Sequence, residues 1–269
     1  MIISKKEVKA VPVYDEQGLK IITKKYLKDL CEELDLYTTP SLNEKLYLHY
    51  KGFSKIDNLD EFINLRALYL DHNCIRRIEN LDKLTQLRCL YLQSNLITKI
   101  ENLDCLPNLM TLNLSHNQIT TIENLGGLKR LQTLDLSYNY LLDGESLGGL
   151  VECQSLTSVD LSNNDTKYSD CILPVFMAMK HLSCLYLREN PVKREFSNYR
   201  KLMITSIPTL LYLDERPVTE NERRIAEAWQ RGGREAEEEE KLKIQQEKKE
   251  RDQQNFLENK EREERARLR

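Results

Sequence analysis

Tyrosine and arginine side chains recur at a fixed interval in the first half of the sequence. Tyr47, Tyr69 and Tyr91 are 22 residues apart, and Arg66 and Arg88 each stand three residues before a tyrosine. These residue types are enriched among the side chains that carry the binding energy of protein interfaces. The chemistry that this pattern predicts is therefore non-covalent recognition of another protein.

Motifs for catalysis and metal binding are missing from the sequence. It contains no GxxxxGK[ST] or GxGxxG loop, no HExxH, no GxSxG and no EF-hand loop. Its four histidines lack the spacing of metal ligands, and we interpret them as surface residues. We therefore predict a protein that is not an enzyme and that needs no cofactor and no metal.

Composition narrows the class of protein further. Of the 269 residues, 31% are charged, above the ~25% of an average globular domain, so part of the chain should lie outside a packed core. The net charge of −3 predicts no binding to nucleic acid or anionic membrane. No apolar run approaches the ~18 residues of a membrane span, and residues 1–14 lack the apolar core of a secretory signal. The seven scattered cysteines, without a CxxC pair, are typical of reduced thiols in the cytosol.

The tyrosines belong to a repeated sequence pattern. LxxLxLxxN begins at Leu65 and returns every 22 residues, and longer copies follow. With a degenerate first copy around Leu46, there are about seven repeats, and the later ones begin at Leu87, Leu109, Leu131, Leu156 and Leu182. The alternating Leu-x-Leu predicts a short strand with its leucines inward, and stacked copies predict a parallel sheet with a continuous core. The asparagine should satisfy backbone groups of neighbouring coils.

The return segments between the strands share a second pattern. Ile-Asp/Glu-Asn-Leu occurs at residues 56–59, 78–81, 100–103 and 122–125. A 22-residue repeat has little room for an α-helix, so we expect 3₁₀ or single-turn helices there. The glycine pairs at 126–127 and 148–149 should serve tight turns. A longer copy should hold a helix over 171–180, capped by Asp170 and with one apolar face, formed by Ile172, Val175, Phe176 and Met179.

The ends of the repeat array should be covered by other elements. Thr23 is expected to cap a helix over 24–34 whose apolar face contains Leu27, Leu30, Cys31 and Leu34. After Pro217 we expect a helix that folds back through Ile225, Ala226 and Trp229, and an interruption at Gly232-Gly233. Beyond residue 234 the chain is charged, with i,i+4 pairs such as Glu237–Lys241 and Glu247–Arg251. Its few apolar residues keep no a/d register, which indicates at most a weak coiled coil.

The fold class that follows is an α/β leucine-rich-repeat solenoid, with its parallel sheet on the concave face and short helical segments on the convex face. We divide the chain into an N-terminal extension (1–22), a helical N-cap (23–40), the repeats (41–190), a C-terminal cap (191–218) and a charged helix (219–269). The last segment is either a solvated helix or partly disordered tail, or a weak partner-binding helix. The sequence ends inside it without a stop signal, which leaves continuation in a longer protein open.

The outward positions of the strands form the candidate binding surface, because alternate strand residues point away from the core. Three tyrosines stand on consecutive coils beside two arginines, and aspartates follow on the middle coils. The predicted partner-binding residues are Tyr47, Tyr69, Tyr91, Asn113, Asp135, Asp160, Tyr186, Arg66, Arg88, Asp71 and Arg188. The alternative is that the tyrosines only shield the sheet from solvent.

The segments that flank the repeats resemble one family. At the start these are Thr23-Lys-Lys-Tyr-Leu-Lys-Asp-Leu-Cys31, Leu36-Tyr-Thr-Thr-Pro40 and Leu46-Tyr-Leu-His-Tyr-Lys-Gly-Phe53. At the end they are Asn190-Pro191, Asn198-Tyr-Arg200, Tyr212-Leu-Asp-Glu-Arg-Pro217 and Glu227-Ala-Trp-Gln-Arg-Gly-Gly233. Over roughly residues 20 to 240 the chain resembles the dynein axonemal assembly factor 1 family.

This resemblance implies a factor for the cytoplasmic preassembly of axonemal dynein arms, found in the cytoplasm and the cilium or flagellum. Its implied partners are axonemal dynein subunits, chaperones or other assembly factors. Three alternatives stay open. One is a resident axonemal protein that contacts tubulin or other axonemal proteins, and another is a phosphatase-regulatory adaptor. The third, an adaptor similar to the spliceosomal leucine-rich-repeat subunit, is disfavoured by the near-neutral charge.

Overall fold

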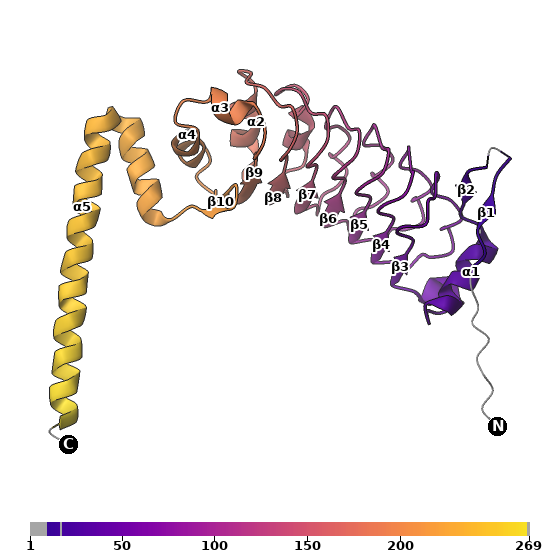
Figure 1. Cartoon of the computed structure of the whole chain (residues 1–269), viewed down its shortest axis with the longest axis horizontal. Helices are drawn as coiled ribbons and strands as arrows, with labels where there is room; N and C mark the ends of the chain where they lie inside the picture. Colours follow the sequence, from indigo (N-terminus) through magenta and orange to yellow (C-terminus); the bar gives the residue numbers. More distant parts are fainter. Residues whose placement is uncertain (1–9, 17, 268–269) are drawn as a thin grey trace.

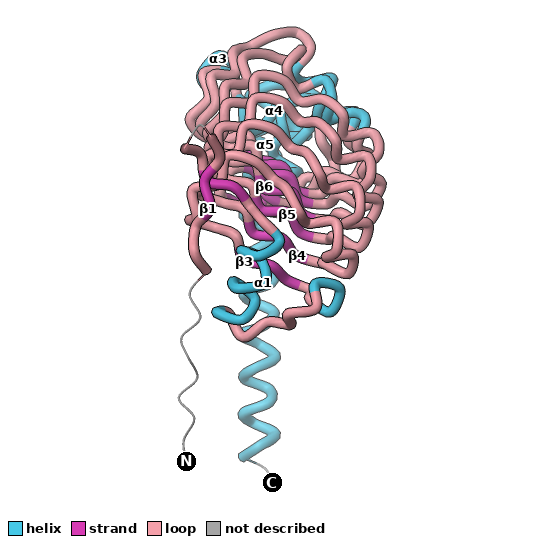
Figure 2. The backbone as a smooth tube through the Cα atoms, turned by 90° about the vertical axis from the view of Figure 1, so that its right-hand side faces the viewer, coloured by secondary structure: helices cyan, strands magenta, loops and turns pink. Residues whose placement is uncertain are grey.

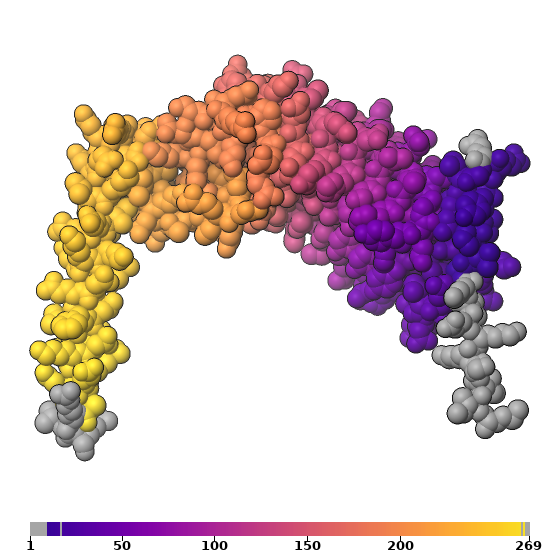
Figure 3. Space-filling model, viewed as in Figure 1, coloured from indigo at the N-terminus to yellow at the C-terminus, as the bar shows by residue number. Residues whose placement is uncertain are grey.

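The computed structural model describes residues 10–16 and 18–267, so the first nine residues of the predicted N-terminal extension lie outside the described part. The chain forms an arch, drawn as a cartoon in Figure 1 and as a space-filling view in Figure 3. In chain order the elements are β1 (Val13–Tyr14), β2 (Lys20–Ile21), α1 (Lys24–Glu33), η1 (Pro40–Leu42), β3 (Lys45–Tyr47), β4 (Ala67–Tyr69), β5 (Cys89–Tyr91), β6 (Thr111–Asn113), β7 (Thr133–Asp135), η2 (Gly148–Glu152), β8 (Ser158–Asp160), α2 (Ile172–Ala178), β9 (Cys184–Tyr186), α3 (Val192–Glu195), α4 (Tyr199–Ser206), β10 (Tyr212–Leu213), β11 (Arg216–Pro217) and α5 (Glu220–Arg267).

The predicted parallel sheet is confirmed. Strands β3 to β10 lie in sequence order in one nine-stranded sheet, and only β11, at its end, is antiparallel. Each strand pairs in the same register, so Leu46, Leu68 and Leu90 are direct neighbours across β3, β4 and β5. Figure 2 shows the strands stacked on one side of the coil with the return loops around them. Since every repeat has the same register, each outward position becomes a straight column along the solenoid.

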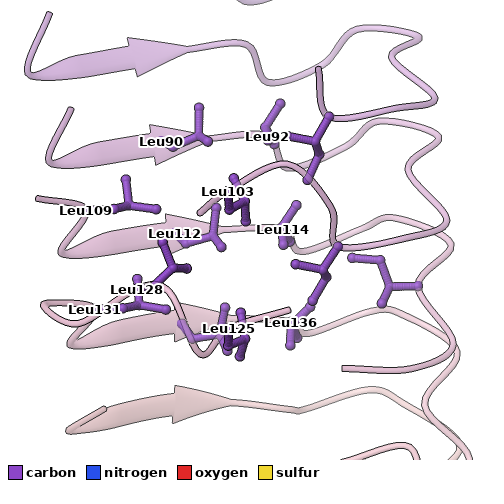
Figure 4. Packing of buried hydrophobic residues seen from close by; sticks show 14 of the residues in the cluster. Leu90, Leu92, Leu103, Leu109, Leu112, Leu114, Leu125, Leu128, Leu131 and Leu136 are labelled. Atoms are coloured by element: carbon purple, nitrogen blue, oxygen red, sulfur yellow. The ribbon is translucent and has the colours of Figure 1, made fainter. Parts of the chain in front are cut away.

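The core is a continuous column of leucine and isoleucine side chains. Leu90, Leu112 and Leu134 on three strands are at most 1% exposed, and so are Leu103 and Leu125 of the return segments. Figure 4 shows Leu90, Leu112, Leu103 and Leu125 among the side chains that meet inside the coil. Burying a leucine side chain is worth about 1.5–3 kcal/mol, so the repeated leucines provide the main stabilisation of the fold.

Asparagines form two hydrogen-bonded ladders through the solenoid. In the predicted ladder, the Asn95 amide donates to the carbonyls of Leu70 and Leu92 and accepts from the Ile75 N–H, each at 3.0 Å. The second ladder was not predicted: Asn80, Asn102 and Asn124 each donate to the isoleucine carbonyl of the preceding coil, at 2.7–2.8 Å. These three residues have φ of 58–59°, a left-handed conformation that asparagine tolerates. Their place in the return pattern is therefore structural.

The return segments differ in part from expectation. In the 22-residue repeats they are single turns with i to i−3 hydrogen bonds, such as Leu84 to Leu81, while the 25-residue repeat has room for the 3₁₀ helix η2. The predicted tight turn at the first glycine pair is confirmed, because the Leu128 N–H donates to the Leu125 carbonyl across Gly126 and Gly127 at 3.0 Å. The second pair lies in η2, and neither pair has positive φ. A Cβ atom on Gly149 would stand 2.3 Å from the Ile122 carbonyl oxygen, so this glycine permits close approach of two coils.

Helix α2 confirms the predicted apolar face but corrects its cap. Ile172, Val175, Phe176 and Met179 are all buried. Asp170 does not cap the helix, because the first helical residue follows Cys171, which makes no side-chain cap hydrogen bond. The Asp170 carboxylate instead accepts a 3.0 Å hydrogen bond from the Tyr168 hydroxyl. The hydrogen-bond donor to the Asp170 carboxylate is therefore a side chain two residues earlier in the loop, not the backbone of α2.

Helix α1 covers the first coil. Its N-cap is Thr23, as predicted, and the Thr23 hydroxyl accepts from the Tyr26 N–H at 3.1 Å. Leu27, Leu30 and Cys31 are buried, but Leu34 is 40% exposed, because the helix ends at Glu33 and Leu34 leaves the apolar face. The short β1–β2 hairpin before α1 was not predicted.

The last coil is covered by α3, α4 and the β10–β11 hairpin. Asp214 replaces the ladder asparagine here, and its carboxylate accepts from the Leu187 N–H at 2.9 Å and pairs with Lys193. Burial raises the pKa of the neighbouring Tyr199 hydroxyl, with the Asp214 carboxylate acting in the same direction. The cap therefore continues the hydrogen bonds of the repeats after their sequence pattern has ended.

Helix α5 is two helical segments joined by an elbow at the predicted interruption. Gly232 and Gly233 have non-helical dihedral angles. The segment before the elbow lies on α4 with Ala226 and Ala228 buried; Ile225 and Trp229, also expected to fold back, are half-buried. The segment after it returns alongside, held by ion pairs, and then projects on the concave side of the arch (Figure 1). No helix in the described part of the chain is long and apolar enough to cross a membrane.

Candidate protein-binding surface

The predicted tyrosines form one stack on the concave face. The rings of Tyr47 and Tyr69 lie 4.9 Å apart at 21°, and those of Tyr69 and Tyr91 lie 4.7 Å apart at 11°. The stack follows from the register of β3, β4 and β5, which places the three residues directly opposite one another. All three side chains are half-buried, and burial raises the pKa of the Tyr91 hydroxyl. We call Tyr47, Tyr69 and Tyr91 the tyrosine stack.

Two exposed arginines stand on the strand-entry side of the tyrosine stack. Arg66 forms a 3.1 Å ion pair with Glu44 of the preceding coil. Arg88, one coil further on, has no acidic partner among the described residues. Since a guanidinium is a planar donor that matches a carboxylate, Arg88 is available to a partner.

The middle coils place Asn113, Asp135 and Asp160 in the same column as the tyrosines. In each, one side-chain oxygen accepts from the backbone N–H two residues later, at 2.9, 3.0 and 2.8 Å, which closes the turn at the strand end. Burial raises the pKa of the Asp135 carboxyl, partly offset by hydrogen bonds from Ser137. These residues therefore have a structural role in addition to any role in binding.

The remaining predicted residues lie apart from the tyrosine stack or are engaged internally. Asp71 is only 8% exposed, and its carboxylate lies 3.0 Å from the imidazole of His72. Tyr186 and Arg188 lie on the last full coil, where Arg188 pairs with Glu215 of the C-terminal cap. The surface thus divides into an aromatic and basic part on β3–β5, an acidic part on β7–β8, and a final part on β9.

A second aromatic column escaped the sequence interpretation. Tyr50 stacks on His72 at 4.1 Å, and His116 stacks on Tyr138 at 4.0 Å, one residue before each ladder asparagine or its equivalent. All four have φ of 53–55°, which turns their side chains onto the rim beside the strand ends. The signal was the recurrence of His72 and His116 at one repeat position, but a histidine alone does not predict stacking. The Tyr50–His72 pair widens the aromatic surface around the tyrosine stack.

The groups on this surface are aromatic rings and charged side chains. Among the described residues, no three His, Cys, Asp or Glu side chains come together to hold a metal ion. What the geometry offers is an aromatic ridge, a free guanidinium and a pair of neighbouring carboxylates. These groups lie on the concave face of a repeat array, and the fold itself defines the class of protein as a leucine-rich-repeat solenoid.

Comparisons with known proteins agree with this class. A family model described as "Leucine-rich repeat" matches residues 97–245, and one described as "Leucine Rich repeats (2 copies)" matches residues 63–105. A crystal structure of an internalin from Listeria monocytogenes superposes with a TM-score of 0.53 at 24% identity, covering 70% of this chain and 50% of the other. A leucine-rich-repeat protein of Leptospira interrogans gives 0.54 at 25% identity, covering 69% and 44%. These structures establish the fold.

Two sequence relatives are more specific. "Leucine-rich repeat-containing protein ODA7" of Chlamydomonas reinhardtii is 53% identical over 87% of this chain and 54% of its own length. "Dynein axonemal assembly factor 1" of Homo sapiens is 64% identical over 82% of this chain and 30% of its own length. The chain belongs to the leucine-rich repeat family, and the expected membership of the dynein axonemal assembly factor 1 family is confirmed by these relatives. It spans about half or less of their length.

Proposed function

We propose that this chain is a non-enzymatic scaffold that binds proteins during the cytoplasmic preassembly of axonemal dynein arms in ciliated cells. The observation that carries the proposal is the tyrosine stack beside the unpaired Arg88, on the concave face of the solenoid. The names of the relatives support a role in axonemal dynein assembly in general, and a cytoplasmic or ciliary setting. The proposed partners are axonemal dynein subunits, chaperones or other assembly factors.

The proposed binding residues fall into two groups. The tyrosine stack, Arg66 and Arg88 supply apolar area and positive charge, and Asp135 and Asp160 supply negative charge two or more coils away. Tyrosine and arginine side chains at the centre of an interface are the residues whose truncation costs most affinity. We place Asn113 between the two groups, on β6, and Tyr186 and Arg188 at the border, on the last full coil. Asp71 lies beneath the surface.

A second candidate function is a resident axonemal protein docked on doublet microtubules or dynein arms. The specific observation in its favour is the exposed end of α5, where Phe256 and Leu257 are 68% and 53% exposed on a charged helix. Such a helix could lie along a filament and contact tubulin or other axonemal proteins.

Affinity purification of the tagged chain from a ciliated cell, from cytosol and from salt-washed axonemes separately, distinguishes these functions. Dynein chains and chaperones recovered from the cytosolic fraction are the expected result. Recovery solely from axonemes, with tubulin, would contradict the assembly proposal and support the resident protein. The Tyr69→Ala/Tyr91→Ala variant, purified in parallel, identifies the partners that depend on the concave face.

A further inference from the structure

Charge changes sign along the concave face. Lys45, Arg66 and Arg88 accompany the first three strands of the solenoid, whereas Asp135 and Asp160 stand on β7 and β8. The sheet order makes this a change along the solenoid axis, not across it. A partner that lies along the axis therefore meets a basic part on β3–β5 and then an acidic part on β7–β8.

The acidic part of the face places two carboxylates side by side, an arrangement that does not stabilise the sheet. Asp135 and Asp160 are direct neighbours in the register of β7 and β8. Like charges opposite one another on adjacent strands destabilise a sheet. Neither carboxylate is in an ion pair with a lysine or arginine of the described chain, and one oxygen of each is already used by the turn at the strand end. A basic side chain of a partner would relieve this repulsion.

The distance between Arg88 and the two aspartates matches the rise of about two turns of an α-helix. The ring centroids of Tyr47, Tyr69 and Tyr91 on neighbouring coils are 4.7–4.9 Å apart, which matches the usual spacing of strands. Arg88 immediately precedes β5, and Asp135 and Asp160 lie on β7 and β8. Along the solenoid axis the basic and acidic groups are therefore two to three coils apart, about 10–14 Å at the usual strand spacing. A helix rises about 1.5 Å per residue, so seven or eight residues cover about 10–12 Å of this distance, and positions seven or eight residues apart share one helix face.

The width of the surface also fits a helix. Arg88 and Tyr91 are three residues apart along the strand, which is about 10 Å, and a helix with its side chains is about 10–12 Å across. An extended chain repeats every two residues, at about 6.6 Å, and does not follow the coil spacing. Helical turns, at about 5.4 Å, can place one side chain near each coil.

We propose that the concave face takes one amphipathic α-helix of a protein partner, parallel to the solenoid axis, with apolar residues on the tyrosine stack, an acidic residue at Arg88, and a basic residue at Asp135 and Asp160. This inference rests on the proposed function, since it names the chemistry of the partner for the same surface. It adds that the acidic and basic positions of the helix are about seven or eight residues apart.

A displayed library of helices tests it with the full chain as target. The library is built on a stable monomeric helix with its exposed positions randomised among Glu, Lys, Leu and Ala. Three targets are compared: the wild type, Arg88→Glu, and Asp135→Asn/Asp160→Asn, in which asparagine keeps the acceptor of the strand-end turn, as Asn113 does.

The wild type should enrich helices with Glu at one position and Lys about seven or eight residues away. Arg88→Glu should select Lys in place of that Glu, and Asp135→Asn/Asp160→Asn should lose the Lys preference alone. Each variant should bind the wild-type helix about tenfold more weakly, the effect of one charge pair worth about 1.4 kcal/mol. No enriched helix, or the same charge pattern from all three targets, would overturn the inference. If that happens while co-purification still depends on Tyr69 and Tyr91, the proposed function stands and the partner is not helical.

Discussion

Tyr69 stacks on Tyr91 with ring centroids 4.7 Å apart and an interplanar angle of 11°. Stacked aromatic pairs contribute about 0.5–1.5 kcal/mol beyond the area they bury, so this pair supports the sheet as well as shaping its surface. A tyrosine variant can lose binding because it unfolds or because it loses contacts with a partner. The two interpretations of the tyrosines, shielding and binding, are therefore separated only when folding and binding are measured on the same variant.

Replacing a ladder asparagine should destabilise the solenoid strongly. Asn95→Ala removes the hydrogen bonds donated to the Leu70 and Leu92 carbonyls and the one accepted from the Ile75 N–H, which are buried, and a longer one to the Gln93 carbonyl. We expect a loss of about 2–4 kcal/mol, because buried backbone groups are left unpaired. Urea unfolding followed by circular dichroism measures it. Asn108→Ala is the matched control, since its bonds to Thr85 and Arg130 are exposed, and it should cost less than about 1 kcal/mol. Equal costs would contradict the ladder's role.

Asp135→Asn should stabilise the fold at neutral pH. Burial raises the pKa of the Asp135 carboxyl, and the Asp160 charge acts in the same direction, so its ionised form is disfavoured in the folded state. Asparagine keeps the turn and removes the charge; we expect a gain of about 0.5 kcal/mol at pH 7.

The pH dependence of this gain has a definite sign. A raised folded pKa means that the penalty appears as the pH rises through it and is absent well below the ordinary value of 3.8. The difference in unfolding free energy between Asp135→Asn and wild type should thus vanish near pH 3. A gain that persists there would show that charge is not its cause.

The elbow of α5 should depend on its two glycines. Gly233 has φ 65° and ψ −147°, a region open essentially to glycine alone, and a Cβ atom on Gly232 would lie 2.9 Å from that of Ala236. Gly232→Ala/Gly233→Ala should therefore straighten α5 into one helix of about 70 Å. Small-angle X-ray scattering should report a larger maximum dimension. Gly148→Ala, whose Cβ atom would meet nothing within 4 Å, should leave the scattering unchanged.

The returning segment of α5 should detach in acid. Hydrogen bonds from Lys201 and then Lys241 lower the pKa of Glu237, and a hydrogen bond from Arg224 lowers that of Glu247. Lowered carboxyl pKa values mean that the attachment is complete above the ordinary value of 4.5 and is lost as the pH falls through the lowered values. Scattering at pH 7 and pH 3 should show the segment released in acid.

Reversing the charge of Arg224 is the control for the scattering measurement in acid. Arg224→Glu should release the segment at neutral pH, because Glu240 and Glu247 both bind Arg224. Adding Glu240→Arg and Glu247→Arg should restore the attachment. A dimension that is unchanged by both acid and Arg224→Glu would mean that the ion pairs do not hold the segment.

The sheet, the core and the tyrosine stack were predictable from the repeat period of the sequence. Because Leu68, Leu90 and Leu112 recur in one register, the sheet, the core and the tyrosine stack all follow from local spacing. The limits of the domains remain a prediction.

Other features depend on tertiary contacts that spacing does not encode. Glu237–Lys241 forms as predicted, but Glu247 makes its ion pair with Arg224, 23 residues away, and not with Arg251. The role of Asp214 as a ladder residue appears only once the β10 strand is in place. For the candidate surface, the shared column of the outward strand residues was predictable, whereas the internal pairs of Asp71 and Arg188 were not.

The central claim is tested most directly by Tyr69→Ala/Tyr91→Ala, with binding and folding measured together. Thermal unfolding should show a cooperative transition only modestly below wild type, and co-purification of the cytosolic partners should be lost. Tyr140→Ala is the control, because Tyr140 is 59% exposed and follows the ladder residue Asn139 on another side of the coil. It should leave both unchanged. A folded double variant that retains its partners would contradict the account and leave the tyrosines as a shield for the sheet.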